Sequence, residues 1–279
     1  MTKGILGVVA CPMLEDELIY SLKNDPEEKH IYVVDTKYDE SIKRKMEKRG
    51  LQFTAIDEWD FQNHSAGIDP EKYNVVIIMN NLALHAEPKD LMNYVQDELV
   101  MLKGRVDAVA LYYGMCGNYG WDISKWADEH LNYPVKVFRD SKGRVCDDCI
   151  GVAVGGLDGY QRLIKEYTGV LLFTPAVAIN QEDFLAASDL MKGALGGKTR
   201  EENKANMKMI LQLCGYNSIV QIDTGLEDRK EFDKATKEWA DYLGFKVLQA
   251  EPDYPDLGPT KRLYQESKKC LDAKAVPTS

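Results

Sequence analysis

The sequence has no apolar run long enough to cross a bilayer, and positive charge is scarce in it. A membrane-spanning helix needs about 20 apolar residues, and the apolar stretch Ile5–Ala10 is also too short and too soon interrupted for a signal peptide. Lysine and arginine number 35 against 45 aspartates and glutamates, giving a net charge of -10. Such an acidic surface argues against a primary role on nucleic acid or on an anionic membrane. We therefore expect a soluble, cytoplasmic protein.

Several catalytic motifs are also missing. No dinucleotide-binding G-x-G-x-x-G fingerprint and no P-loop lysine motif occurs, and Gly151, Gly155 and Gly156 do not form one. There is no G-x-S-x-G elbow, which argues against a hydrolase triad. In a reducing cytoplasm the six cysteines are not expected to form structural disulfides. They are then core thiols, metal ligands or redox groups.

Short, continuous apolar runs alternate with stretches of helical periodicity. Continuous rather than alternating apolar character is typical of strands buried on both faces. Strands that alternate with helices of ten or more residues predict an α/β fold, with a mainly parallel sheet covered by helices on both faces. The predicted strands are residues 4–10, 30–34, 75–79, 108–113, 135–138, 170–173, 218–222 and 246–248.

The chain divides into two predicted α/β halves without a long linker or a sequence repeat. Residues 1–168 form the first half and residues 169–279 the second, unless the two make one continuous domain. Two helical patterns in residues 180–213 follow one another without a strand and would cap the sheet or mark the boundary. The charged tail after Glu251 is expected to be a surface appendage.

Reactive side chains follow the ends of several predicted strands. Cys11 directly follows the first strand, His85 lies in the loop after Met79, and Cys116 lies just beyond the strand ending at Tyr113. Cys146 and Cys149 form a C-x-x-C at the start of a helix. Because ligands gather at the carboxyl ends of the strands in an open parallel sheet, these groups are expected to share one rim.

Thiolate and imidazole are ligands that zinc and iron–sulfur clusters use. A shell of three cysteines and one histidine suits tetrahedral zinc. A shell of Cys11, Cys116, Cys146 and Cys149 would instead suit a cluster. Helix N-termini after Cys11 and near Cys149 would lower the thiol pKa values.

Other interpretations of these cysteines stay open. A free cysteine often merely packs in the core, and the ligand spacing is not that of a zinc finger or a ferredoxin. Redox chemistry at Cys146 and Cys149 ranks third, because the carboxylates of Asp147 and Asp148 would raise the thiol pKa values.

Four segments together resemble the DUF1638 family. They are Ala10–Leu18, Leu84-His85, Tyr113–Asn118 and Val145–Ile150. Members of this family occur in anaerobic bacteria and methanogenic archaea, often beside corrinoid-dependent methyltransferase systems. The resemblance implies a metal shell of Cys11, His85, Cys116 and Cys149, with Cys146 as an extra.

Two functions follow from these interpretations. In the first, the chain is a metal protein, with zinc or alternatively an iron–sulfur cluster, that acts in corrinoid-dependent methyl transfer or one-carbon metabolism. Its partner would be a corrinoid protein or a methyltransferase. Cys146, Asn118 and Asp148 are the candidate cofactor contacts. In the second, the chain is a non-catalytic carrier of a metal, cluster or corrinoid.

Overall fold

The computed structural model describes residues 1–81, 88–114, 122–181, 196 and 199–274. Two parallel sheets organise these residues, as the sequence predicted for an α/β protein. The elements of the first part are β1 (Gly4–Ala10), η1 (Pro12–Leu14), α1 (Glu15–Asn24), β2 (His30–Val34), α2 (Glu40–Lys48), β3 (Thr54–Ile56), α3 (Glu58–Gln62), β4 (Tyr73–Met79), α4 (Pro88–Met101), β5 (Ala108–Tyr112), α5 (Ile123–His130) and β6 (Val135–Val137). Those of the second part are α6 (Cys149–Ala153), α7 (Leu157–Glu166), β7 (Val170–Phe173), α8 (Pro175–Ile179), α11 (Arg200–Leu213), β8 (Ser218–Gln221), α12 (Arg229–Leu243), β9 (Lys246–Gln249) and α13 (Gly258–Lys274).

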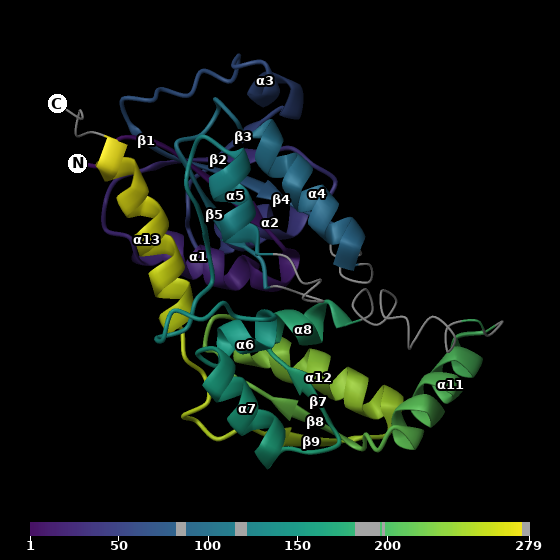
Figure 1. Cartoon of the computed structure of the whole chain (residues 1–279). Helices are drawn as coiled ribbons and strands as arrows, with labels where there is room; N and C mark the ends of the chain where they lie inside the picture. The colour runs from purple at the N-terminus through teal and green to yellow at the C-terminus, as the bar shows by residue number, and fades with distance from the viewer. Residues whose placement is uncertain (82–87, 115–121, 182–195, 197–198, 275–279) are drawn as a thin grey trace.

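The larger sheet has six parallel strands in the order β3-β2-β4-β1-β5-β6 (Figure 1). The three central strands are fully or almost fully buried, because their continuous apolar side chains are covered on both faces. The chain leaving β1 passes to β2, whereas the chain leaving β4 passes to β5 on the other side. Right-handed crossovers in opposite directions place α1 and α2 on one face and α4 and α5 on the other.

The smaller sheet has three parallel strands in the order β7-β8-β9. We call the six-stranded sheet with its helices the first unit, and the three-stranded sheet with the helices around it the second unit. Figure 1 shows the second unit below the first, and η1, at the carboxyl end of β1, packs against α8. The carboxyl rim of the larger sheet therefore faces the second unit.

The C-terminal helix α13 is part of the core of the first unit, which corrects the expectation of a surface appendage. It packs against α1, β1, β5 and β6, alongside the purple α1 in Figure 1. Leu263, Tyr264 and Leu271 are buried there, and the Tyr264 hydroxyl lies 2.8 Å from that of Tyr73. The many charged residues of α13 hid this apolar stripe from the sequence. Among the described residues, no helix combines the length and the apolar character that crossing a membrane requires.

Candidate functional site

Cys11 lies where β1 ends. The connections that leave β1 and its neighbour β4 run in opposite directions, so Cys11 lies at the point where they diverge. Its N–H donates to the Tyr112 carbonyl at 3.0 Å, and its own carbonyl accepts from Leu14 at 2.9 Å. Its side chain is only 5% exposed. Such a point of diverging connections, between β1 and β4, is where open α/β sheets form their ligand crevice.

Burial controls the chemistry of the Cys11 thiol. Desolvation raises its pKa to about 12, and this outweighs a hydrogen bond from the Met13 backbone, while Glu15 adds to the increase. The expectation that a helix N-terminus lowers this pKa is therefore wrong for Cys11. The helical turn that follows it is η1, a short 3-10 turn. Its N-terminus lowers the thiol pKa by less than desolvation raises it. Without a bound metal the thiol stays protonated at neutral pH.

Asn80 occupies the matching position at the end of the neighbouring strand β4. Its N–H donates to the Ala10 carbonyl at 2.9 Å. Its side-chain amide and the Tyr113 hydroxyl are buried close to each other, and neither makes a hydrogen bond of good geometry among the described residues. Burial raises the pKa of Tyr113 well above its usual value, Cys11 adds to the increase, and the Asn80 amide opposes it. Buried polar groups without good hydrogen bonds are costly, and they mark the place where a ligand or a further polar group is accommodated.

Cys149 is held at the same rim by a close backbone contact with Gly114. A Cβ atom at Gly114 would lie 2.6 Å from the Asp148 Cα and 3.0 Å from the Cys149 nitrogen. Asp148 caps α6 through its Oδ1, which accepts from the Gly151 N–H at 2.6 Å. Cys11 therefore lies beside Tyr112 at the end of β5, and Cys149 lies beside Gly114, two residues further along the same chain.

The thiol of Cys146 has different neighbours. The Cys146 N–H donates to the Phe138 carbonyl at 3.0 Å. Burial raises its pKa to about 12, Asp140 adds to the increase, and the Arg262 guanidinium opposes it. This thiol thus lies in the charged surroundings of Asp140 and α13.

Three of the predicted site residues, His85, Cys116 and Asn118, lie outside the described residues. Within the described ranges, no three or more histidine, cysteine, aspartate or glutamate side chains are grouped as a metal site requires. The structure thus brings Cys11, Asp148 and Cys149 to the end of β5. It also places Gly114, two residues before Cys116 in the chain, directly against Cys149.

Tyr113 and the buried acids of α1 are features that sequence reasoning missed. Glu15, Asp16 and Glu17 are at most 5% exposed, although three successive acidic residues in a first helical turn are typical of a solvated surface. Desolvation, with Asp16 adding, raises the pKa of Glu17 to about 8. The one sequence signal for their burial is that these acids come directly after the strand end at Cys11-Pro12.

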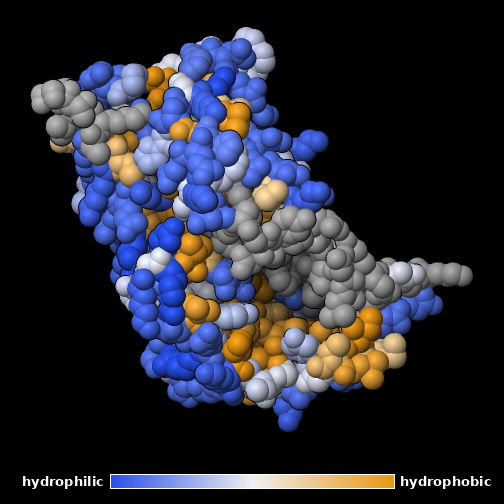
Figure 2. Space-filling view, viewed as in Figure 1, coloured by the Kyte–Doolittle hydropathy of each residue, from blue (hydrophilic) through white to orange (hydrophobic). Residues whose placement is uncertain are grey.

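Figure 2 shows a hollow beside the second unit, and apolar side chains (orange) gather on that unit next to it. Exposed apolar residues of α8 and α11 include Ile179, Met209 and Leu213. The molecule is thus a two-unit α/β protein with buried thiols at the strand ends of the larger sheet and an apolar wall of exposed side chains on α8 and α11.

The sequence comparisons assign this protein to a family. The model of the family described as "Protein of unknown function (DUF1638)" matches residues 79–259, well over half of the chain, and the chain belongs to this family. The matched range includes Asn80, Tyr113, Cys146 and Cys149, and Cys11 precedes it. No curated protein and no solved structure matches the chain.

Proposed function

We propose that this chain is a metal protein whose ligands are Cys11, His85, Cys116 and Cys149. The observation that supports this proposal best is the end of β5. Cys11 is hydrogen-bonded to Tyr112 there, and the backbone of Cys149 touches Gly114. The segment that carries Cys116 therefore leaves from between two buried cysteines.

The chemistry of the thiols fits a soft or borderline divalent metal. With a pKa of about 12, the Cys11 thiol is a poor free nucleophile, but a bound metal removes the thiol proton outright. Zinc is favoured over an iron–sulfur cluster, because a four-cysteine shell would need the Cys146 thiolate, which burial and the Asp140 carboxylate disfavour. Asp148 is half-buried beside Cys149 and would orient a histidine ligand.

The proposed role is in corrinoid-dependent methyl transfer or another one-carbon reaction. If only three of the four proposed ligands held the zinc, the open fourth position would hold a substrate thiol as thiolate. The chain itself would bind and orient that substrate through the Asn80 amide and the Tyr113 hydroxyl, which lie at the crevice and make no hydrogen bond of good geometry among the described residues. A partner that carries a corrinoid would cover the apolar wall of α8 and α11.

The burial of both described ligands favours a second candidate, a non-catalytic carrier. Cys11 and Cys149 are 5% and 6% exposed, and a fourth protein ligand would close the shell completely. A closed shell stores or transfers metal, or stabilises the fold, but offers no position for a substrate.

The test of the metal site is metal analysis of protein purified without oxygen, together with its visible spectrum. We expect about one zinc per chain and no visible absorption, as a Cys3His site requires. C11S, C116S and C149S should each lose the metal. C214S, which alters an exposed cysteine at the end of α11, should keep it and serves as the matched control.

Two results would change the assignment. Iron with sulfide and a brown absorption, lost in C146S, would mean a cluster. Wild-type protein that takes up no metal even after reconstitution would refute the site altogether. If zinc is present, methyl transfer from a methylcorrinoid to a thiol without any added protein would identify an enzyme, and its absence would favour the carrier.

A further inference from the structure

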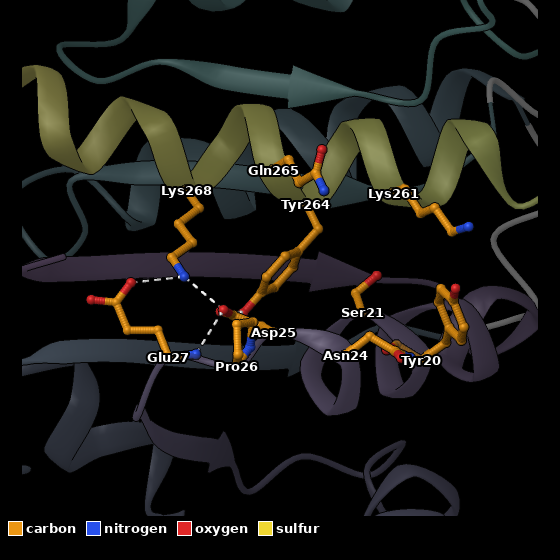
Figure 3. A pocket seen from close by; sticks show the side chains of 10 residues that line it. All are labelled: Tyr20, Ser21, Asn24, Asp25, Pro26, Glu27, Lys261, Tyr264, Gln265 and Lys268. Atoms are coloured by element: carbon orange, nitrogen blue, oxygen red, sulfur yellow. Dashed lines mark hydrogen bonds and ion pairs between the residues drawn. The ribbon is translucent and has the colours of Figure 1, made fainter. Parts of the chain in front are cut away.

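A pocket of about 460 Å³ lies between α1 and α13, at the end of α1 that is remote from Cys11 (Figure 3). One side is lined by Tyr20, Ser21 and residues 24–27, and the other by Lys261, Tyr264, Gln265 and Lys268. Its volume is within the range of sites that bind small organic molecules. The metal site proposed above uses none of these residues.

One end of the pocket is already neutralised by its own ion pairs. Lys268 Nζ lies 2.7 Å from Asp25 Oδ1 and 2.9 Å from Glu27 Oε2, as the dashed lines in Figure 3 show. The Tyr264 hydroxyl donates to the other oxygen of Asp25 at 2.9 Å. The Thr2 N–H donates to the remaining oxygen of Glu27 at 2.5 Å. All four carboxylate oxygens are occupied, so this end offers nothing to a cation.

The opposite end carries a positive charge that has no ion-pair partner among the described residues. Lys261 Nζ lies 6.0 Å from the centroid of the Tyr20 ring, and the two side chains face each other across the pocket. Among the described residues neither Lys261 Nζ nor the Gln265 side chain takes part in a hydrogen bond or an ion pair.

We infer that this pocket binds a small organic monoanion that carries an aromatic ring. The carboxylate would pair with Lys261 and accept a hydrogen bond from the Gln265 amide. The ring would pack against the face of Tyr20. A single cation without an ion-pair partner matches a single negative charge on the ligand.

The test measures phenylacetate binding by titration calorimetry and by ligand-observed NMR on the full chain. Phenylacetate should bind saturably, and its neutral analogue phenylacetamide should bind about tenfold more weakly or not at all. K261Q should weaken phenylacetate binding by about tenfold, and Tyr20→Leu should weaken both ligands. K269Q changes an exposed lysine of the same helix outside the pocket lining and should leave binding unchanged.

Three results would overturn the inference: no saturable binding of phenylacetate to the wild type, equal binding of the acid and the amide, or equal binding to K261Q and K269Q. Because Lys261 is exposed, K261Q should fold normally, and a circular dichroism spectrum identical to that of the wild type confirms this. C149S should bind phenylacetate as the wild type does, so the outcome is independent of the metal site.

Discussion

Gly114 is the residue on which the geometry of the strand-end site depends. A methyl group there would collide with backbone atoms of Asp148 and Cys149, and backbone cannot move aside as a flexible side chain can. We expect Gly114→Ala to lower the free energy of unfolding by about 1–3 kcal/mol, a typical cost of overpacking. It should also lower the zinc content, because it separates Cys149 from the segment leading to Cys116.

Urea unfolding and metal analysis of the same preparations measure both effects. Gly196→Ala is the matched control, since a Cβ atom at Gly196 meets nothing within 4 Å. Wild-type stability and metal content in Gly114→Ala would show that the contact does not position Cys149.

Glu17 makes the stability depend on pH in a defined direction. Desolvation raises its folded-state pKa from 4.5 to about 8, so the folded chain keeps a proton that the unfolded chain loses. The free energy of unfolding therefore falls as the pH rises from about 4.5 to about 8. Glu17→Gln should remove this loss. Between about pH 5 and about pH 8.5, the free energy of unfolding should therefore fall less in the variant than in the wild type, by on the order of a few kcal/mol.

Urea unfolding at the two pH values tests this, with Glu28→Gln at an exposed position as the control. An unchanged pH dependence in Glu17→Gln would mean that Glu17 ionises normally in the folded protein.

Single residues at the strand ends could be predicted from the sequence only in part. Cys11 and Cys149 follow or begin recognisable elements, so their place at the rim follows from the general rule for parallel sheets. The roles of Asn80 and Tyr113 could not be predicted, because a neutral amide or phenol becomes notable only when its burial is known.

At the scale of elements, the strands of the larger sheet that are rich in apolar residues were predicted almost to the residue. β1 and β2 match their predicted bounds, and β4 extends its prediction by two residues. β3 was missed because only Ile56 of its three residues is buried, which leaves no apolar run to detect. The packing of α13 depends on contacts with distant strands, and local periodicity does not report these.

The docking of α13 has a measurable energy. Leu263 is 1% exposed on this helix, whereas Leu213 at the end of α11 is 81% exposed. Leu263→Ala should lower the free energy of unfolding by about 2–5 kcal/mol through lost burial and a new cavity. Leu213→Ala should stay within about 0.5 kcal/mol of the wild type. Equal effects of the two substitutions in urea unfolding would mean that α13 does not stay docked in solution.

At the scale of the whole molecule, one buried lysine connects the two units. Lys45 Nζ on α2 lies 2.8 Å from Glu15 Oε1, 2.8 Å from Asp16 Oδ1 and 3.4 Å from Glu227 Oε2, just before α12. Burial raises the pKa of Asp16 to about 6, and Lys45 limits this increase. Burial would also raise the pKa of Glu227, but a backbone hydrogen bond from Asp228 and the nearby cations, Lys45 first, lower it. Glu15 and Asp16 follow Cys11 by a few residues, and Glu227 belongs to the second unit. The ion pairs of Lys45 therefore hold the second unit over the strand ends.

Lys45→Met should therefore be far more harmful than Lys48→Met. Removing Lys45 leaves buried carboxylates without their shared counter-ion, which typically costs about 3–5 kcal/mol. Lys48 is half-exposed, and its shorter ion pair, 3.0 Å, is with the exposed Glu231, where an ion pair is worth about 0–1 kcal/mol. Urea unfolding gives the energies, and amide hydrogen exchange in η1 and in residues 223–228 shows whether the contact between the units opens. If exchange there is as slow in Lys45→Met as in Lys48→Met, apolar packing of η1 on α8 must hold the units together without the ion pairs.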